Sequence, residues 1–249
     1  CIRDRMTTVD GSSGFYAMAF VGSEYFIVRN MSLINNSTVS QTVIFGAGAS
    51  NNTIENCSIK ASVSSTSTTV NAIGASNSLT TRSTNTPGVH NNTIQNNRII
   101  GGYYGVYFYG GTGNLQSGNK ILNNEIDSSY NSGVYTYYVD NMEVSGNNIN
   151  LLSRANVNAD GIYTNYAANY TIEGNQINVP DYGIYFYDAS TSTGARFKKT
   201  ELINNMIVSD ADYGVYLYSV DSVNLYHNTI VTYGPNATSS PAVYIGMST

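Results

Sequence analysis

Short alternations of apolar and polar residues recur along the chain, each bounded by Gly, Asn, Asp or Ser, and none has the 3.6-residue spacing of an amphipathic helix. One motif places two aliphatic residues five positions apart around an Asn-rich segment. Its copies span residues 28–33, 54–59, 94–99, 121–126, 144–149, 172–177, 202–207 and 225–230. Successive copies start 23 to 40 residues apart. The shortest spacing indicates the bare repeat, and the longer ones predict loops inserted into it.

A second motif, Gly-aliphatic-Tyr-x-Tyr, lies between copies of the first. It spans residues 105–109, 133–137, 161–165, 183–187 and 214–218, with a degenerate copy at 242–246 and early copies at 18–20 and 43–45. In four turns the first motif starts ten residues after the aliphatic residue of the second. The predicted order is therefore strand, Asn bend, strand, variable loop, strand, repeated about eight times.

Such short repeats predict a solenoid, because one 23-residue unit cannot bury its own apolar side. We expect an all-β chain in which residues 1–249 form a single parallel coil of about eight to nine turns, with loop insertions at 61–90 and 189–200. At about 4.8 Å per turn the coil is roughly 40 Å long. Strand alternation places one set of side chains inside and the tyrosines outside. The predicted interior set is Val106, Phe108, Ile184, Phe186, Val215 and Leu217.

The sequences Asn-Asn-Thr-Ile-Gln-Asn-Asn-Arg-Ile (91–99) and Tyr-Gly-Val-Tyr-Phe-Tyr (104–109) resemble the repeats of the pectin-lyase-like superfamily. The resemblance covers residues 15–246 and implies a right-handed parallel β-helix. It implies no single activity, because the superfamily contains lyases, hydrolases, epimerases, adhesins and non-catalytic surface proteins. The chain contains neither the Gly-His-Gly nor the Arg-Ile-Lys sequence of the polygalacturonase-like hydrolases.

An asparagine row occupies one position in six consecutive turns: Asn97, Asn124, Asn147, Asn175, Asn205 and Asn228. Met31 and Cys57 hold this position in the two preceding turns. Asn tolerates the left-handed backbone of a tight bend, and stacked amides can hydrogen-bond along the coil. The row therefore favours a structural role over polar ligand binding, with Cys57 as a small buried residue.

Two tyrosine files follow the outer side of the second motif. The first contains Tyr107, Tyr135, Tyr163, Tyr185, Tyr216 and Tyr244; the second contains Tyr109, Tyr137, Tyr187 and Tyr218, with Asn165 interposed. Aromatic surfaces with hydroxyl tips suit sugar rings or a protein partner. The alternative is that neighbouring rings only stabilise the sheet, by about 0.2–1 kcal/mol for each pair.

Acidic residues beside these strands are candidate catalytic groups. Asp160, Asp181 and Asp212 precede the strand glycine in three consecutive turns. Carboxylates about 5 Å apart can serve retaining glycoside hydrolysis, and Asp181 with Asp212 can hold a calcium ion, which is the one cofactor considered. Asp is also an ordinary turn residue, which is the interpretation that the surrounding sequence favours.

A polyuronate lyase needs a cationic residue near the carbon that loses its proton. The candidates are Arg98, Arg154, Arg196, Lys198, Lys199 and His227. Arg196, Lys198 and Lys199 form a group in the 189–200 loop. His227 lies one place before the asparagine row and is interpreted as a turn residue.

The composition narrows the function classes. The chain has 249 residues, of which 11% are charged, and a net charge of −5, which argues against a nucleic-acid partner. No apolar run predicts a membrane span. Two cysteines exclude a disulfide-dense scaffold. With 33 Asn, 23 Gly and 22 Tyr, the surface is typical of secreted or cell-surface bacterial β-helices.

We therefore expect an extracellular module with a structural or binding role, whose tyrosine face contacts a polysaccharide or a surface protein. The alternative is a polysaccharide lyase or glycoside hydrolase, or a fragment of one. No capping segment is evident at either end, which predicts a piece of a longer chain or head-to-tail self-association. Cys1 is compatible with a lipidated mature N-terminus and with a truncation point.

Overall fold

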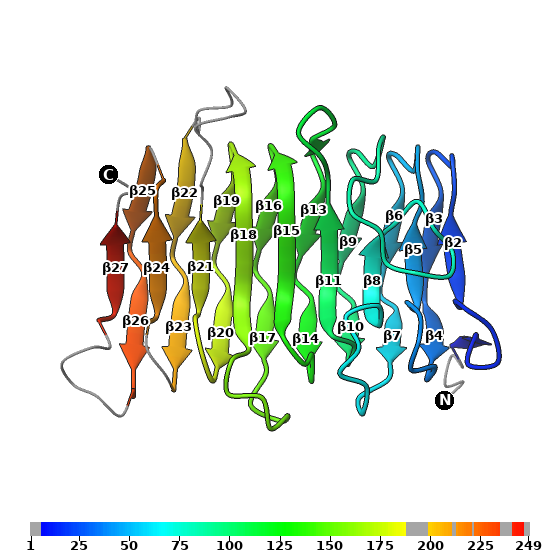
Figure 1. The fold of residues 1–249 in the computed structure, drawn as a ribbon, viewed down its shortest axis with the longest axis horizontal. Coiled ribbons are helices and arrows are strands. Elements are labelled where there is room, and N and C mark those ends of the chain that lie inside the picture. The colour runs from blue at the N-terminus through cyan, green and yellow to red at the C-terminus, as the bar shows by residue number, and fades with distance from the viewer. Residues whose placement is uncertain (1–5, 188–198, 211–212, 221, 235–240, 247–249) are drawn as a thin grey trace, which may run out of the picture.

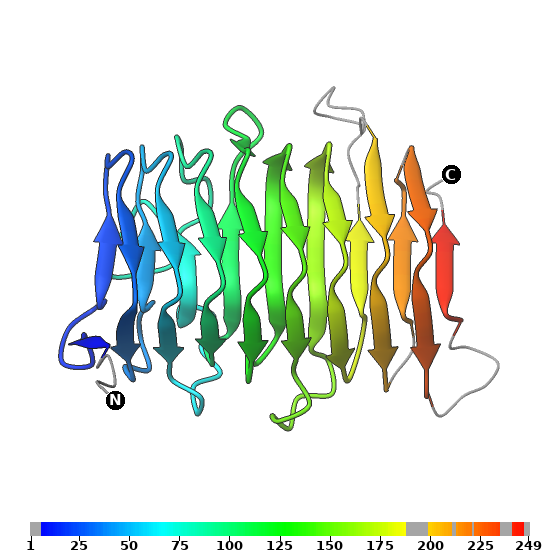
Figure 2. The same ribbon diagram turned by 180° about the vertical axis from the view of Figure 1, so that it is seen from behind.

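The computed structural model describes residues 6–187, 199–210, 213–220, 222–234 and 241–246, and no helix occurs within these ranges. The chain winds into a parallel coil with three long sheets, which we call A, B and C (Figures 1 and 2). Each turn contributes a strand to sheet C, then to sheet A, then to sheet B. The predicted all-β solenoid of eight to nine turns is confirmed.

Sheet A consists of β1 (Thr7–Asp10), β4 (Met31–Asn35), β7 (Ser58–Ala61), β10 (Arg98–Ile100), β14 (Glu125–Asp127), β17 (Asn148–Asn150), β20 (Gln176–Val179), β23 (Met206–Ser209) and β26 (Thr229–Thr232). Sheet B consists of β2 (Met18–Phe20), β5 (Val43–Phe45), β8 (Asn71–Ala75), β11 (Tyr104–Tyr109), β15 (Ser132–Asp140), β18 (Asp160–Ala168), β21 (Ile184–Tyr187), β24 (Val215–Tyr218) and β27 (Val243–Gly246). The short β12 (Gln116–Ser117) pairs with β15. Sheet C consists of β3 (Ile27–Arg29), β6 (Thr53–Glu55), β9 (Thr93–Gln95), β13 (Lys120–Leu122), β16 (Glu143–Ser145), β19 (Thr171–Glu173), β22 (Thr200–Ile203) and β25 (Val223–Tyr226).

The core fills the coil with the aliphatic side chains that the alternation assigns to it. All six predicted interior residues of sheet B are at most 1% exposed. Two turns differ, because the inward position after the aliphatic residue is a threonine. The Thr136 hydroxyl donates to the Thr164 hydroxyl at 2.7 Å, and the buried Tyr170 hydroxyl lies 3.4 Å from Thr136. A polar cluster of this kind is stable inside the coil because its members satisfy one another.

The glycine of the second motif is required by close packing at the corner between sheets A and B. A Cβ on Gly161 would lie less than 3.0 Å from the Ile177 side chain and from the Gly183 carbonyl oxygen. At Gly105, Gly133, Gly183 and Gly214 a Cβ would likewise lie less than 3.0 Å from an isoleucine side chain of sheet A and from a backbone carbonyl oxygen of the next turn of sheet B. The glycine is therefore needed to leave space for the isoleucines of sheet A, and not to provide an unusual backbone angle.

The asparagine row lies just after the bend between sheets C and A. Each row amide from Asn97 to Asn205 donates to the amide oxygen of the next row residue at 2.9–3.0 Å. The left-handed backbone belongs to the residue before the row, with φ between +52° and +68° from Asn56 to His227. Our expectation that the row residues themselves take the left-handed conformation is therefore wrong, whereas His227 is a turn residue as predicted.

The predicted insertion at 61–90 contains a strand. β8 runs fully buried through sheet B between β5 and β11, so only the segments on either side of it are loops. The early and late copies of the second motif are confirmed as β2, β5 and β27. Residues 188–198 of the second predicted insertion lie outside the described ranges, and Thr200 opens β22. None of the described residues belongs to a helix apolar and long enough to cross a membrane.

Candidate functional site: the tyrosine face of sheet B

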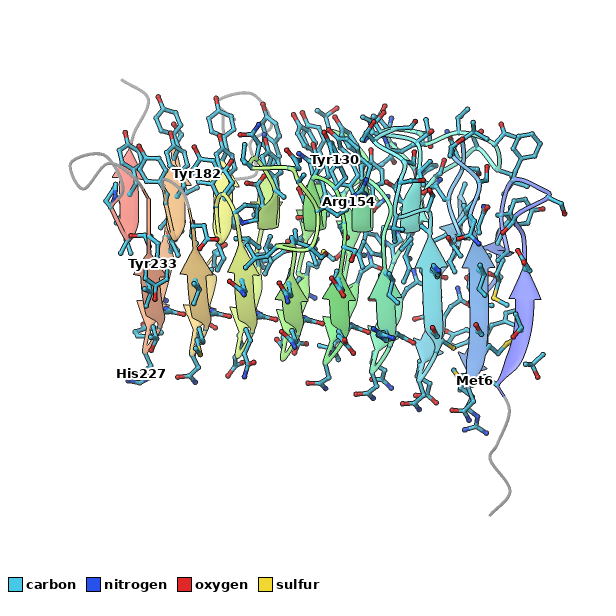
Figure 3. All side chains as sticks on the ribbon, turned by 90° about the horizontal axis from the view of Figure 1, so that it is seen from below. Met6, Tyr130, Arg154, Tyr182, His227 and Tyr233 are labelled. Carbon is cyan, nitrogen blue, oxygen red and sulfur yellow. The ribbon has the colours of Figure 1, made fainter. Side chains whose placement is uncertain are left out.

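The first tyrosine file is a continuous stack of six rings on the outer side of sheet B. Successive ring centroids from Tyr107 to Tyr244 lie 4.7–5.5 Å apart, and successive ring planes differ by 15° or less. The stack follows from the register, because sheet B pairs each ring with its equivalent one turn away. Figure 3 shows aromatic side chains, among them the labelled Tyr130 and Tyr182, along one side of the coil.

The second file is interrupted at β18. Tyr109 stacks on Tyr137 at 4.4 Å, and Tyr187 stacks on Tyr218 at 5.4 Å, with Asn165 between the two pairs. The ring of Tyr166, the next residue, packs 5.1 Å from Tyr137 at an angle of 58°. The files lie 6.0–6.4 Å apart where they are measured within one strand.

The stacking determines which part of each ring a ligand can meet. Because neighbouring rings cover one another's faces, the surface presents ring edges and hydroxyl tips, not the open faces that we expected. Burial raises the pKa of the Tyr135, Tyr163, Tyr185 and Tyr216 hydroxyls, so they remain neutral donors and acceptors. The arrangement is a double row of hydroxyl groups at the strand spacing.

Tyr107 is the exception to the exposure that we predicted for the tyrosines. It points away from the core but is 0% exposed, because Arg82 and Ser83, in the segment between β8 and β9, pack against it. Figure 1 shows this segment crossing the outer side of sheet B. Arg82 in this segment lies 4.9 Å from the Tyr107 ring centroid and 5.5 Å from that of Tyr104. The Tyr107 hydroxyl donates to the Ser83 carbonyl oxygen at 3.4 Å. The accessible face therefore extends from β15 toward β27.

A third set of outward side chains precedes the strand glycines. Its Asp160 was noticed from the sequence, but the set as a whole was not. It contains Tyr104, Ser132, Asp160, Tyr182 and Tyr213. Tyr182 stacks on Tyr213 at 5.5 Å and meets Tyr185 edge-on at 5.0 Å. The recurrence of Tyr directly before Gly in three copies of the motif is the sequence signal that could have revealed it.

Asp160 is the most unusual member of this third set. It is 8% exposed, and its Oδ1 atom has no hydrogen-bond partner. Burial, with a smaller contribution from the Asp181 charge, raises the pKa of the Asp160 carboxyl well above its ordinary value. Burial of this kind favours the protonated form of a carboxyl, which can donate a hydrogen bond. The structure thus brings Asp160 and Asp181 together, whereas Asp212 lies outside the described residues.

The structure describes four of the six candidate cations; they are dispersed, and three of them are engaged. Arg154 donates to the Gly102 and Ser65 carbonyl oxygens at 3.3 and 3.0 Å and covers the Tyr130 ring at 4.9 Å. Arg98 and Lys199 pair with glutamates at 3.5 and 2.9 Å. Arg196 and Lys198 lie outside the described residues. Among the described residues no group of three or more His, Cys, Asp or Glu side chains could hold a metal ion, and the proposed calcium site stays a prediction.

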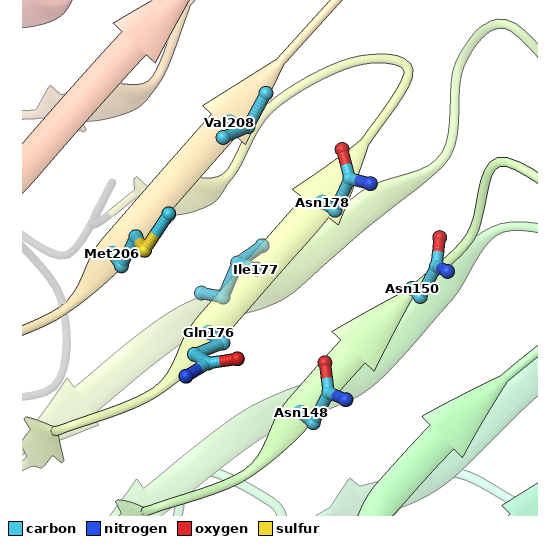
Figure 4. A pocket seen from close by; sticks show the side chains of 7 residues that line it. All are labelled: Asn148, Asn150, Gln176, Ile177, Asn178, Met206 and Val208. Carbon is cyan, nitrogen blue, oxygen red and sulfur yellow. The ribbon is translucent and has the colours of Figure 1, made fainter.

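A second surface feature lies on the outer side of sheet A, across β17, β20 and β23. It is a hollow of about 270 Å³ lined by Asn148, Asn150, Gln176, Ile177, Asn178, Met206 and Val208 (Figure 4). The lining is uncharged, and register places the amides of two turns beside the apolar residues of a third. The hollow lies on sheet A, whereas the tyrosine files lie on sheet B.

Comparison with solved structures finds similar folds at low sequence identity. A periplasmic alginate epimerase, AlgG, is 15% identical with a TM-score of 0.49, over 94% of this chain and 48% of that protein. PfbA, a surface adhesin of Streptococcus pneumoniae, is 15% identical with a TM-score of 0.42, over 88% of this chain and 64% of that one. The catalytic domain of a GH87 α-1,3-glucanase is 12% identical with a TM-score of 0.20, over 94% of this chain and 64% of that one.

The chain spans about half to two thirds of the length of these three proteins. No curated protein sequence gives a significant match. A family model described as the right-handed β-helix region matches residues 86–245, which is more than half of the chain. The chain therefore belongs to the right-handed β-helix family, and its three parallel sheets form the coil that the family description names.

Proposed function

We propose that the tyrosine face over β15, β18, β21 and β24 binds a neutral polysaccharide outside the cell. The observation that carries the proposal is the unbroken stack of rings from Tyr135 to Tyr244, beside a second, partial file. Its hydroxyls form a regular array of neutral donors and acceptors separated by apolar ring edges. A sugar polymer offers the complementary surface, with hydroxyl groups and C–H groups at short intervals.

Charge favours a neutral polymer over a polyuronate. Ligands with one carboxylate per sugar need cations along the binding surface, and the chain carries a net charge of −5. The two described arginines nearest the face, Arg82 and Arg154, already cover aromatic rings. The low proportion of charged residues and the Asn-, Gly- and Tyr-rich composition support a secreted or cell-surface location.

Substitutions that remove hydroxyls without removing rings test the proposal. Tyr185→Phe combined with Tyr216→Phe keeps the stack, so the melting temperature should change little. Loss of two hydrogen bonds, at about 1 kcal/mol each, should weaken polysaccharide retention roughly thirtyfold. Tyr226→Phe, on the half-exposed Tyr226 of sheet C, is the matched control.

The assay is retention on insoluble neutral glucans, mannans and chitin, with alginate and polygalacturonate as acidic comparisons. Retention of the unsubstituted protein on a neutral polymer, lost in the double variant and kept in the control, supports the proposal. Equal retention of all three proteins would overturn it. Retention by a surface protein instead of any glycan would favour the protein-partner alternative.

A second candidate function is hydrolysis of the bound polymer, favoured by the buried Asp160 carboxyl beside Asp181. A carboxyl with a raised pKa next to a second carboxyl is the pairing that glycoside hydrolysis requires. Release of reducing ends from any polymer that is retained, abolished by Asp160→Asn, supports this function. Retention without product release over a prolonged incubation refutes it.

A further inference from the structure

The strand β18 breaks the aromatic pattern of sheet B at two positions. The turns at β11, β21 and β24 carry Tyr at all three outward positions, and β15 carries Ser, Tyr and Tyr. In β18 the corresponding residues are Asp160, Tyr163 and Asn165. Asp160 and Asn165 therefore form a polar strip across the tyrosine face, with Tyr163 of the first file between them.

Both polar residues of this strip are buried with an unused oxygen. Asp160 is 8% exposed and Asn165 is 6% exposed, and neither Oδ1 atom has a hydrogen-bond partner. Native proteins satisfy the great majority of such atoms, so these two oxygens retain the capacity to accept a hydrogen bond from a ligand or from water. Tyr163 links the two residues, because Asn165 hydrogen-bonds its hydroxyl and the Asp160 charge acts on the same group.

The residue after the second file adopts a left-handed backbone in several turns. Tyr138 and Tyr166, in the two adjacent long strands β15 and β18, have φ values of +53° and +51°, and Ser219 has +53° at the equivalent position after Tyr218. The bend therefore belongs to the repeat, and its occupation by two adjacent tyrosines is particular to β15 and β18. The bend directs the two rings onto one another at 4.6 Å, beside the break that Asn165 makes in the second file.

We propose that Asp160, Tyr163 and Asn165 form a subsite for one neutral sugar unit of a polymer bound along the tyrosine face. The inference rests on the proposed function and deepens it, because the remaining turns are too uniform to distinguish one sugar from another. The Asn165 oxygen accepts from a sugar hydroxyl, and the Asp160 carboxyl exchanges hydrogen bonds with another. Tyr137 and Tyr187 flank the unit at the second file. The rings beside the strip must part to admit the sugar.

The test combines affinity with stability, because a structural role predicts a loss of stability and a binding role predicts a loss of affinity at nearly unchanged stability. Asn165→Leu and Asp160→Leu replace the two polar groups with apolar side chains of similar size. Each variant should keep a melting temperature close to that of the unsubstituted protein. Removal of the unsatisfied buried oxygen offsets loss of the hydrogen bond that the same side chain makes, with the Tyr163 hydroxyl for Asn165 and with the Tyr182 backbone for Asp160. Each should also bind at least tenfold more weakly in isothermal titration with a soluble oligosaccharide of whichever polymer, glucan, mannan or chitin, retains the unsubstituted protein. Ser132→Ala, at the position equivalent to Asp160 one turn earlier, is the matched control.

The outcomes separate this inference from the proposed function. Unchanged affinity in both leucine variants, with affinity still lost in the Tyr185→Phe and Tyr216→Phe double variant, overturns the subsite and leaves the tyrosine face standing. A clear fall in melting temperature in Asn165→Leu overturns the subsite as well, because it assigns the amide a structural role. Failure of the unsubstituted protein to bind any neutral glycan overturns the proposed function, and the subsite with it.

Discussion

Asn147 lies in the middle of the asparagine row, where each side chain is held by both neighbouring turns. Its Nδ2 donates to the Ile121 carbonyl oxygen at 2.9 Å and to Asn175 Oδ1 at 3.0 Å. Its Oδ1 accepts from the backbone N–H and from Nδ2 of Asn124, at 2.9 and 3.0 Å. The residue is 1% exposed, so water does not replace these bonds.

Asn147→Ala should therefore be strongly destabilising. The Asn124 backbone N–H and the Ile121 carbonyl oxygen both lose the partner that Asn147 provides. Each buried group left unsatisfied costs about 1–3 kcal/mol, so the expected loss is about 2–6 kcal/mol. This is a large fraction of the roughly 5–15 kcal/mol by which a domain is stable.

Urea unfolding followed by circular dichroism measures this loss, with Asn148→Ala as the matched control. Asn148 is the next residue, points outward from sheet A, and should change stability by less than about 0.5 kcal/mol. Equal unfolding midpoints for the two variants would refute the view that the row amides are structural hydrogen-bonding groups. A destabilisation below about 1 kcal/mol for Asn147→Ala would do the same.

Three further substitutions test other parts of the structure. Gly161→Ala should destabilise by about 1–3 kcal/mol, because its Cβ overlaps Ile177, and thermal unfolding against Gly113→Ala, where the space is open, measures this. Asp160→Asn should stabilise the protein at pH values above the ordinary pKa of Asp. The pKa of Asp160 is raised in the folded state, so the unsubstituted protein loses stability as the pH rises from the ordinary pKa toward the raised one. Melting temperatures measured against pH should show this loss only when Asp160 is present. Arg154→Ala should lower the melting temperature by a few degrees in the same assay, since two carbonyl oxygens lose their donor.

The fold could be predicted because most turns repeat the same apolar, Asn and Gly residues at the positions that form the core and the bends. Ile54 to Ile59 and its copies define two strands and the bend between them, and the Gly-aliphatic-Tyr motif defines the third. The predicted interior and exterior of sheet B then follow from alternation alone. β8 was missed because its Asn-Ala-Ile-Gly-Ala sequence lacks the tyrosines that identify its neighbours.

The site was less predictable, because its properties depend on long-range contacts and ring orientation. No periodicity reveals that the segment containing Arg82 passes over Tyr107, since its path depends on the Arg82 and Ser83 contacts. The stacking of rings face to face likewise depends on rotamers that the register imposes. The three acids were noticed for their position before the glycine, but the burial of Asp160 results from the packing around it.

The regularity of sheet B constrains how such a surface can recognise a ligand. In-register turns place identical side chains over one another, which stabilises the coil and gives the face the same chemistry at every step. A uniform array can hold a polymer at any register along its length, so it supplies affinity without selectivity. Selectivity requires a turn that departs from the repeat, and β18 departs from it at both positions that flank Tyr163. The stability forgone at Asp160 and Asn165 is thus most simply explained if recognition, and not the coil, requires them.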